Sequence, residues 1–174
     1  VAIGTWAGRS ITSDRNTALG AFTRENPSAN ATGPNTAVGF SSLGGIVGGN
    51  NTAVGVQTGA NLTGENNTVM GHVACSNRLT GHNNVILGAN SLSATGATGT
   101  NIPARIASYN TTVGTNTLKT IESGNFNVAI GYDALADSTG CEQNVAIGPY
   151  SLKENNRWSN VSIGPYAMRS NTTG

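Results

Sequence analysis

The stretch Asn127-Val128-Ala129-Ile130-Gly131-Tyr132-Asp133-Ala134-Leu135 decides the fold, because it recurs throughout the chain. It returns almost letter for letter at residues 144–152 and again at residues 160–168. Shorter copies lie at residues 16–20, 35–39, 51–55, 67–71, 84–88 and 110–114, and residues 1–4 form a truncated one. Such an internal repeat has to be read before any secondary structure is assigned.

The repeats end in glycines that mostly lie 16 or 17 residues apart: Gly4, Gly20, Gly39, Gly55, Gly71, Gly88, Gly114, Gly131, Gly148 and Gly164. Helix-turn-helix repeats need about 33–47 residues and propeller blades about 40 or more. A shorter period suits one coil of a β-solenoid, made of two short strands and two turns. The sequence therefore predicts an all-β, parallel β-solenoid (β-roll) of about ten coils, forming a single domain over residues 1–174.

Side chains alternate across a strand, so each repeat has two faces. The larger aliphatic side chains are predicted to fill the coil, joined by leucines from the second strand: Val128, Ile130, Leu135, Val145, Ile147, Leu152, Val161 and Ile163. The other face carries small residues that would let another chain approach: Asn127, Ala129, Gly131, Asn144, Ala146 and Gly148. Ordering a coil costs roughly 1.5 kcal/mol per residue, whereas a buried aliphatic side chain returns only about 1.5–3 kcal/mol. A narrow solenoid is therefore marginal alone, and we expect a parallel homo-oligomer.

Charged residues make up only 10% of the chain and the basic residues form no run. We therefore expect no nucleic-acid footprint. No apolar run approaches the roughly 18–20 residues that span a bilayer, so no membrane insertion is expected. The two cysteines, Cys75 and Cys141, lie about four coils apart. At about 4.8 Å per coil, their separation exceeds the ~7 Å Cα limit for a disulfide. We predict no bridge between them, and we predict that Cys75 is buried because other copies carry Leu there.

Catalytic chemistry has no repeated signature. Asp133, Asp137 and Glu154 are the acids that the repeat brings near one another, and a glycosidase needs two carboxyls about 5–10 Å apart. Solvated turn residues are the plainer interpretation. His72 and His82 fall in adjacent coils without an evident third ligand. We predict no catalytic residue, no metal site and no cofactor.

Residues that break the period are the candidates for recognition. Extra residues interrupt it near 24–33 and 94–109, and insertions in solenoids often carry binding. The second insertion supplies three candidate receptor contacts, Pro103, Arg105 and Tyr109. Tyr150 and Tyr166 take the same place in successive coils. A stacked aromatic ladder there is either a carbohydrate platform or a surface that packs against a neighbouring chain.

The repeated Asn-Val-Ala-Ile-Gly-x-x-Ala/Ser resembles the head repeat of YadA-type trimeric adhesins, a left-handed parallel β-roll. The longer form, with Asn-Asn-Thr-Ala-Val-Gly and Thr-Gly-x-Asn-Asn, is more similar to repeats of trimeric bacteriophage tail fibres and spikes. The coils here are longer than those of the adhesin family. This resemblance implies a homotrimer on the virion surface: a non-enzymatic structural or adhesive rod that positions or makes contact with a host-surface glycan or protein. Both ends are open coils without a cap, whereas solenoid ends are normally capped, so we expect further virion or fibre domains at both ends of a longer chain.

Three alternatives stay open at this point. The same fold serves as the head of a trimeric autotransporter-type adhesin on the outer surface of bacteria. A polysaccharide depolymerase spike would use Asp133, Asp137 or Glu154. Ice binding by a flat array of threonines is weakened, because the Thr of the first strand becomes Val in most copies from Asn84 onward.

Overall fold

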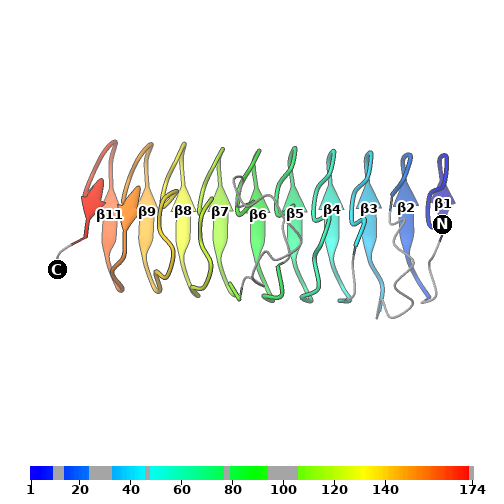
Figure 1. Ribbon diagram of the computed structural model, residues 1–174, viewed down its shortest axis with the longest axis horizontal. Helices are drawn as coiled ribbons and strands as arrows, with labels where there is room; N and C mark the ends of the chain where they lie inside the picture. Colours follow the sequence, from blue (N-terminus) through cyan, green and yellow to red (C-terminus); the bar gives the residue numbers. More distant parts are fainter. Residues whose placement is uncertain (10–13, 24–32, 46–47, 77–78, 94–105, 173–174) are drawn as a thin grey trace.

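The computed structural model describes residues 1–9, 14–23, 33–45, 48–76, 79–93 and 106–172. All regular structure in these ranges is β, and the chain forms a parallel β-solenoid (Figure 1). One ten-stranded sheet runs along it, with its strands side by side in sequence order: β1 (Ala2–Ile3), β2 (Thr17–Leu19), β3 (Thr36–Val38), β4 (Thr52–Val54), β5 (Thr68–Met70), β6 (Val85–Leu87), β7 (Thr111–Val113), β8 (Val128–Ile130), β9 (Val145–Ile147) and β11 (Val161–Ile163). A second, two-stranded sheet joins β10 (Glu154–Asn155) to β12 (Ser170–Asn171).

Every strand of the large sheet lies in the same register on the strand before it. Val128 pairs with Val145, Ala129 with Ala146 and Ile130 with Ile147. Equivalent residues are usually 16 or 17 positions apart. The register survives the two longer steps of 19 and 26 residues. The predicted parallel solenoid of about 17-residue coils is therefore confirmed.

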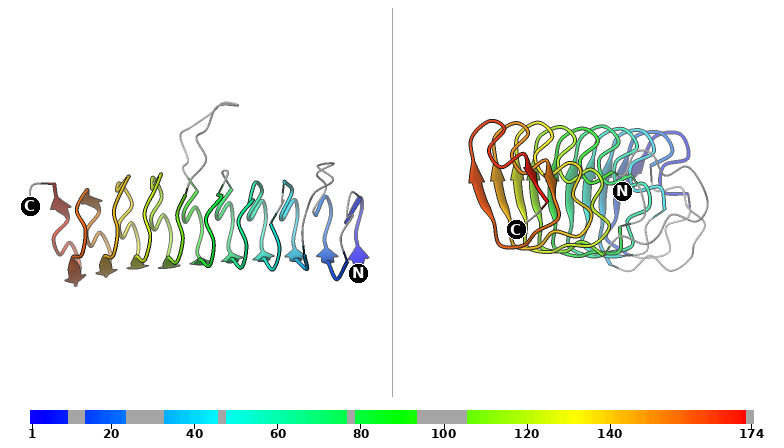
Figure 2. Two further views of the ribbon diagram at one scale, coloured as in Figure 1. Left: turned by 90° about the horizontal axis from the view of Figure 1, so that it is seen from below. Right: turned by 60° about the vertical axis from the view of Figure 1, so that its left-hand side comes forward.

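The sheet forms one side of the rod, and turns close the other sides (Figure 2). The sequence predicted a second strand directly after each motif glycine, but these residues are turns. Their backbone explains the difference, because Asp133 and Leu135 both adopt left-handed φ angles, 55° and 52°, which an extended strand does not contain. Among the described residues, strand-like pairing on the second side is confined to β10 with β12 and to isolated bridges such as Leu62 with Leu79.

The prediction of which face fills the coil was wrong. The middle residue of each strand points inward, as fully buried Ala129 and Ala146 show. The flanking aliphatics point outward: Val161 and Ile163 are 67% and 68% exposed, and Val128, Ile130, Val145 and Ile147 are only half-buried. Leu135 and Leu152 do fill the interior, as predicted. A further interior wall, made by Leu62, Leu79 and Ile121, was not predicted.

A buried column of asparagines decides this orientation. The Asn127 amide nitrogen donates to the Cys141 carbonyl across the coil, at 2.9 Å, and to Asn110 Oδ1, at 3.0 Å. Its own Oδ1 accepts from the backbone N–H of Asn144, at 3.0 Å. Because the amide is held inward, alternation turns Val128 and Ile130 outward. The same coil-to-coil bond links the members of this asparagine column: Asn16, Asn35, Asn51, Asn67, Asn84, Asn110, Asn127, Asn144 and Asn160.

The motif positions require glycine because the next coil of the same chain leaves no room for a side chain. Gly131 has φ +128°, and a Cβ on it would lie 2.6 Å from the carbonyl carbon of Gly148. Six residues were expected to face a partner chain, but they lie inside their coil or against the adjacent coil: Asn127, Ala129, Gly131, Asn144, Ala146 and Gly148.

Cys75 and Cys141 form no disulfide with each other, and both are buried, as predicted for Cys75. Burial raises the pKa of the Cys141 thiol to about 11, so this thiol stays protonated and unreactive at neutral pH.

Candidate functional site

One surface feature continues from coil to coil: the outward face of the large sheet, which we call the outer stripe. It comprises the first and third residues of β2 to β9 and of β11. One row is Thr17, Thr36, Thr52, Thr68, Val85, Thr111, Val128, Val145 and Val161, and the other is Leu19, Val38, Val54, Met70, Leu87, Val113, Ile130, Ile147 and Ile163. The stripe holds no charged residue, and its first row changes from mainly Thr to mainly Val toward the C-terminus.

The outer stripe is a continuous surface patch. At about 4.8 Å per strand and about 3.3 Å per residue, it measures roughly 40 Å by 10 Å, or about 400 Å². The largest apolar patch on a typical monomer covers about 300–600 Å² and is often functional. A flat, uncharged β-sheet face of this size is suited to pack against another protein surface.

Aromatic residues lie at the margin where the strands end. We call the two residues after each motif glycine the glycine corner. There the Tyr150 and Tyr166 rings stack, with centroids 4.8 Å apart and an interplanar angle of 11°. Tyr132 meets Tyr150 edge to face, with centroids 5.4 Å apart. The ladder predicted for Tyr150 and Tyr166 is therefore present. Burial, followed by the neighbouring Tyr132 and Tyr166, raises the pKa of Tyr150.

The stacking limits what the Tyr150–Tyr166 ladder can bind. A sugar ring stacks on an open aromatic face, but these two rings cover one face of each other. Along its side the ladder presents ring edges and phenol oxygens, and Tyr166 is 58% exposed at its end. Such edges suit aromatic contacts with protein, for which edge-to-face geometry is favourable.

A second aromatic pair lies at the opposite margin, where the strands begin. We call the residue before each member of the asparagine column the asparagine corner. Tyr109 and Phe126 stack there, with centroids 4.9 Å apart and an angle of 6°. Phe126 was missed from the sequence, although its position relative to Asn127 matches that of Tyr109 relative to Asn110. The other candidate contacts of that insertion, Pro103 and Arg105, lie outside the described residues.

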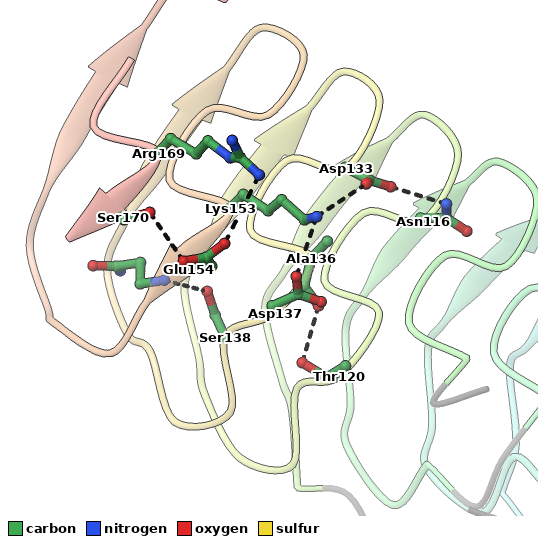
Figure 3. A network of polar contacts seen from close by, with 11 residues as sticks. Asn116, Thr120, Asp133, Ala136, Asp137, Ser138, Lys153, Glu154, Arg169 and Ser170 are labelled. Atoms are coloured by element: carbon green, nitrogen blue, oxygen red, sulfur yellow. Dashed lines mark hydrogen bonds and ion pairs between the residues drawn. The ribbon is translucent and has the colours of Figure 1, made fainter. Parts of the chain in front are cut away.

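An ionic network ties neighbouring coils together near the C-terminus (Figure 3). Lys153 Nζ lies 3.4 Å from Asp137 Oδ2 and 3.7 Å from Asp133 Oδ2. Asn116 Nδ2 donates to Asp133 Oδ1 at 2.9 Å. Burial disfavours the charged form of Lys153, but Asp137 and Asp133 outweigh it and raise the pKa of the lysine above 10.5.

This network gives the candidate acids a structural role. Asp133 and Asp137 share one ammonium group, and Glu154 accepts from Ser170 Oγ at 2.9 Å and lies 4.0 Å from Arg169 Nη2. Each acid therefore contacts a residue of another coil. Lys153 was not predicted, because its partners come from one coil earlier and no repeated motif marks it.

The histidines provide no metal site in the described part of the chain. His82 Nδ1 accepts a bond from the Glu65 backbone N–H at 3.1 Å. Among the described residues, no group of three or more His, Cys, Asp or Glu side chains could hold a metal ion. Within the same ranges, no helix has the length and apolarity needed to cross a membrane.

Comparison with known proteins gave no match to a family model, to a curated protein or to a solved structure. The functional interpretation therefore rests on the outer stripe and the corners.

Proposed function

We propose that this chain is a non-enzymatic shaft or spike segment of a homotrimeric bacteriophage fibre, which positions or makes contact with the host surface. The observation that carries the proposal is the outer stripe: an uncharged β-sheet face that runs the length of the rod and is open in a single chain. The partner that fits it best is a further copy of the same face.

Three copies around an axis parallel to the rod would bury all three stripes. Packed sheet faces lie about 10 Å apart, and a closed ring leaves no copy of the stripe open. A parallel arrangement matches the direction of change from Thr to Val, so that the most apolar strands of each copy, β8, β9 and β11, lie at the same level.

The mechanical role follows from the coil-to-coil ladders. Each coil contacts its neighbours through backbone pairing and the asparagine column. A solenoid of this kind is a quasi-one-dimensional rod, here roughly 45 Å long at about 4.8 Å per strand. Recognition of a host glycan or protein would fall to residues that interrupt the repeat or to adjoining fibre domains.

The experiment is light scattering of the purified chain and of Ile147→Asp. We expect the parent chain to be a trimer at micromolar concentration. Ile147→Asp should keep its β-type circular dichroism but be monomeric, because each trimer would bury three carboxylates near one axis. Thr139→Asp, at an exposed turn position, is the matched control and should remain trimeric. A parent chain that is a folded monomer would refute the proposal.

The fibre and the bacterial adhesin share this fold and the same stripe. A signal peptide and a membrane-anchor barrel in the same reading frame would indicate the adhesin, and neighbouring virion genes would indicate the fibre. Cleavage of a polysaccharide by the intact trimer, lost in Asp137→Asn, would overturn the non-enzymatic role and indicate the depolymerase.

A further inference from the structure

We propose that Tyr109 and Phe126 of one protomer pack against Tyr132 and Tyr150 of the next protomer, so that aromatic rings fill the seam of the trimer at this level. This inference rests on the proposed trimer and names the contacts that complete it.

Simple geometry shows that the strands cannot close the trimer alone. Each strand has three residues, which span about 10 Å at about 3.3 Å per residue. Sheet faces held about 10 Å apart lie about 5 Å from the central axis, and a triangular prism of that size has sides of roughly 17 Å. About 7 Å of each side must therefore be filled by residues at the strand margins.

The margins that meet carry different residues. In a parallel three-fold arrangement, the asparagine corner of one protomer adjoins the glycine corner of the next. At the level of β7 to β9, the first carries Tyr109 and Phe126 and the second carries Tyr132 and Tyr150. Tyr109, Phe126 and Tyr132 are 53%, 56% and 47% exposed in a single chain. Four rings are thus available to fill this part of the seam.

The backbone conformation does not favour aromatic residues at these two positions, so the role of these residues lies in their side chains. Phe126 and Tyr109 adopt φ angles of 60° and 59°, a left-handed conformation that bulky residues rarely take and that Asn takes more easily. The same position holds Asn50, Asn66 and Asn83 in earlier coils, with similar φ angles. The aromatic residues therefore accept a conformational cost that asparagine would reduce.

The rings are confined to one level of the asparagine corner. This corner is polar at Asn50, Asn66 and Asn83, and it is polar again at Gln143 and Ser159. In a parallel trimer whose copies share one axial level, Phe126 faces Tyr132 across the seam, because both residues adjoin β8. Tyr109 and Tyr150 then lie one coil to either side, about 4.8 Å away.

Disulfide trapping in the full chain tests the seam. Phe126→Cys/Tyr132→Cys should give a covalent trimer on denaturing gels after mild oxidation, and either single variant should give none. Strand β8 separates the two positions within one chain, which places them beyond the ~7 Å Cα limit for an internal bond. The native Cys75 and Cys141 are fully buried and can stay. Phe126→Cys/Tyr166→Cys, displaced by two strands or about 10 Å, is the control for the level of the contact and should not link.

A second measurement tests the seam even where the cysteine variants fail to assemble. Phe126→Ala and Tyr132→Ala should each weaken trimer association by roughly three- to tenfold, and the double variant should be weaker by less than the product. Such coupling reports contact, and within one chain these rings belong to separate pairs. Equal linking at both cysteine pairs, no linking in a proven trimer, or independent effects of the two alanines would each refute the seam. A monomeric parent chain would instead refute the proposed trimer itself.

Discussion

The asparagine column lies directly before the strands whose outward residues form the outer stripe, but the two follow different rules. Inside, one residue type recurs in every coil, because each amide must meet a carbonyl across the coil and an asparagine on each neighbouring coil. Outside, the stripe varies among Thr, Val, Leu, Met and Ile, because an apolar face needs only shape and hydrophobicity. Directional bonds thus specify the coil, and the stripe is left free for association.

The most direct test of the difference between the inward and outward faces places the same charge on two adjacent residues. Ala146→Asp puts a carboxylate at a fully buried position and should lower the free energy of unfolding by about 4 kcal/mol or more. Ile147→Asp, one residue later, should leave the folded coil intact. Urea unfolding followed by circular dichroism distinguishes them, and near-equal midpoints would contradict the assigned faces.

Removing one amide tests the asparagine column directly. Asn127→Ala leaves the Cys141 carbonyl and the Asn144 N–H without their partner. Buried orphaned groups cost about 1–3 kcal/mol each, so we expect a loss of about 3–5 kcal/mol in unfolding free energy at fixed protein concentration. Asn156→Ala, on the exposed surface, is the control and should change stability by less than about 0.5 kcal/mol.

Alanine variants of two glycines test how closely the coils must stack. Gly131→Ala should cost about 2 kcal/mol or more, because its Cβ would meet Gly148 at 2.6 Å and its φ is +128°. At Gly140 a Cβ meets only Ser123 Oγ at 3.8 Å, so Gly140→Ala should be nearly neutral. Thermal unfolding of both variants is sufficient, and a tolerated Gly131→Ala would show that the coils can separate.

The smallest effect is expected from the ion bridges. Lys153→Met should lower stability by about 0.5–1 kcal/mol, less at high salt. The pKa of Lys153 is raised on folding, so its contribution is fully present below the unfolded pKa, near 10.4. It is lost as pH rises through the higher folded value. Urea titrations of parent and variant should differ at pH 8, and this difference should disappear once the pH exceeds the folded pKa of Lys153.

Much of the fold could be predicted because the length of the repeat can be counted directly in the sequence. The 16–17-residue spacing indicates stacked coils, and it places Tyr150 next to Tyr166 and keeps Cys75 far from Cys141. The orientation of each strand could not be obtained in this way, since alternation defines two faces without saying which lies inside. Hydrophobicity favoured Val128 and Ile130, whereas the Asn127 amide decides through a carbonyl fourteen residues away.

The sites that were missed depend on neighbours beyond one repeat. Phe126 precedes the repeat that begins at Asn127, so it was not compared with Tyr109. Lys153 acquires its role from two aspartates of the preceding coil. The left-handed φ of Leu135 gave no signal, because an apolar residue at that position suggests a strand.

The asparagine column also makes the rod tolerant of length. Across the 26-residue step, the Asn110 N–H still donates to Asn84 Oδ1 at 2.9 Å, and Asn84 Nδ2 still reaches the Ala107 carbonyl at 2.7 Å. Each asparagine re-registers the chain, whatever number of residues precedes it. A foreign peptide spliced into this step should therefore leave the rungs on either side in place, which makes the rod a natural scaffold for display.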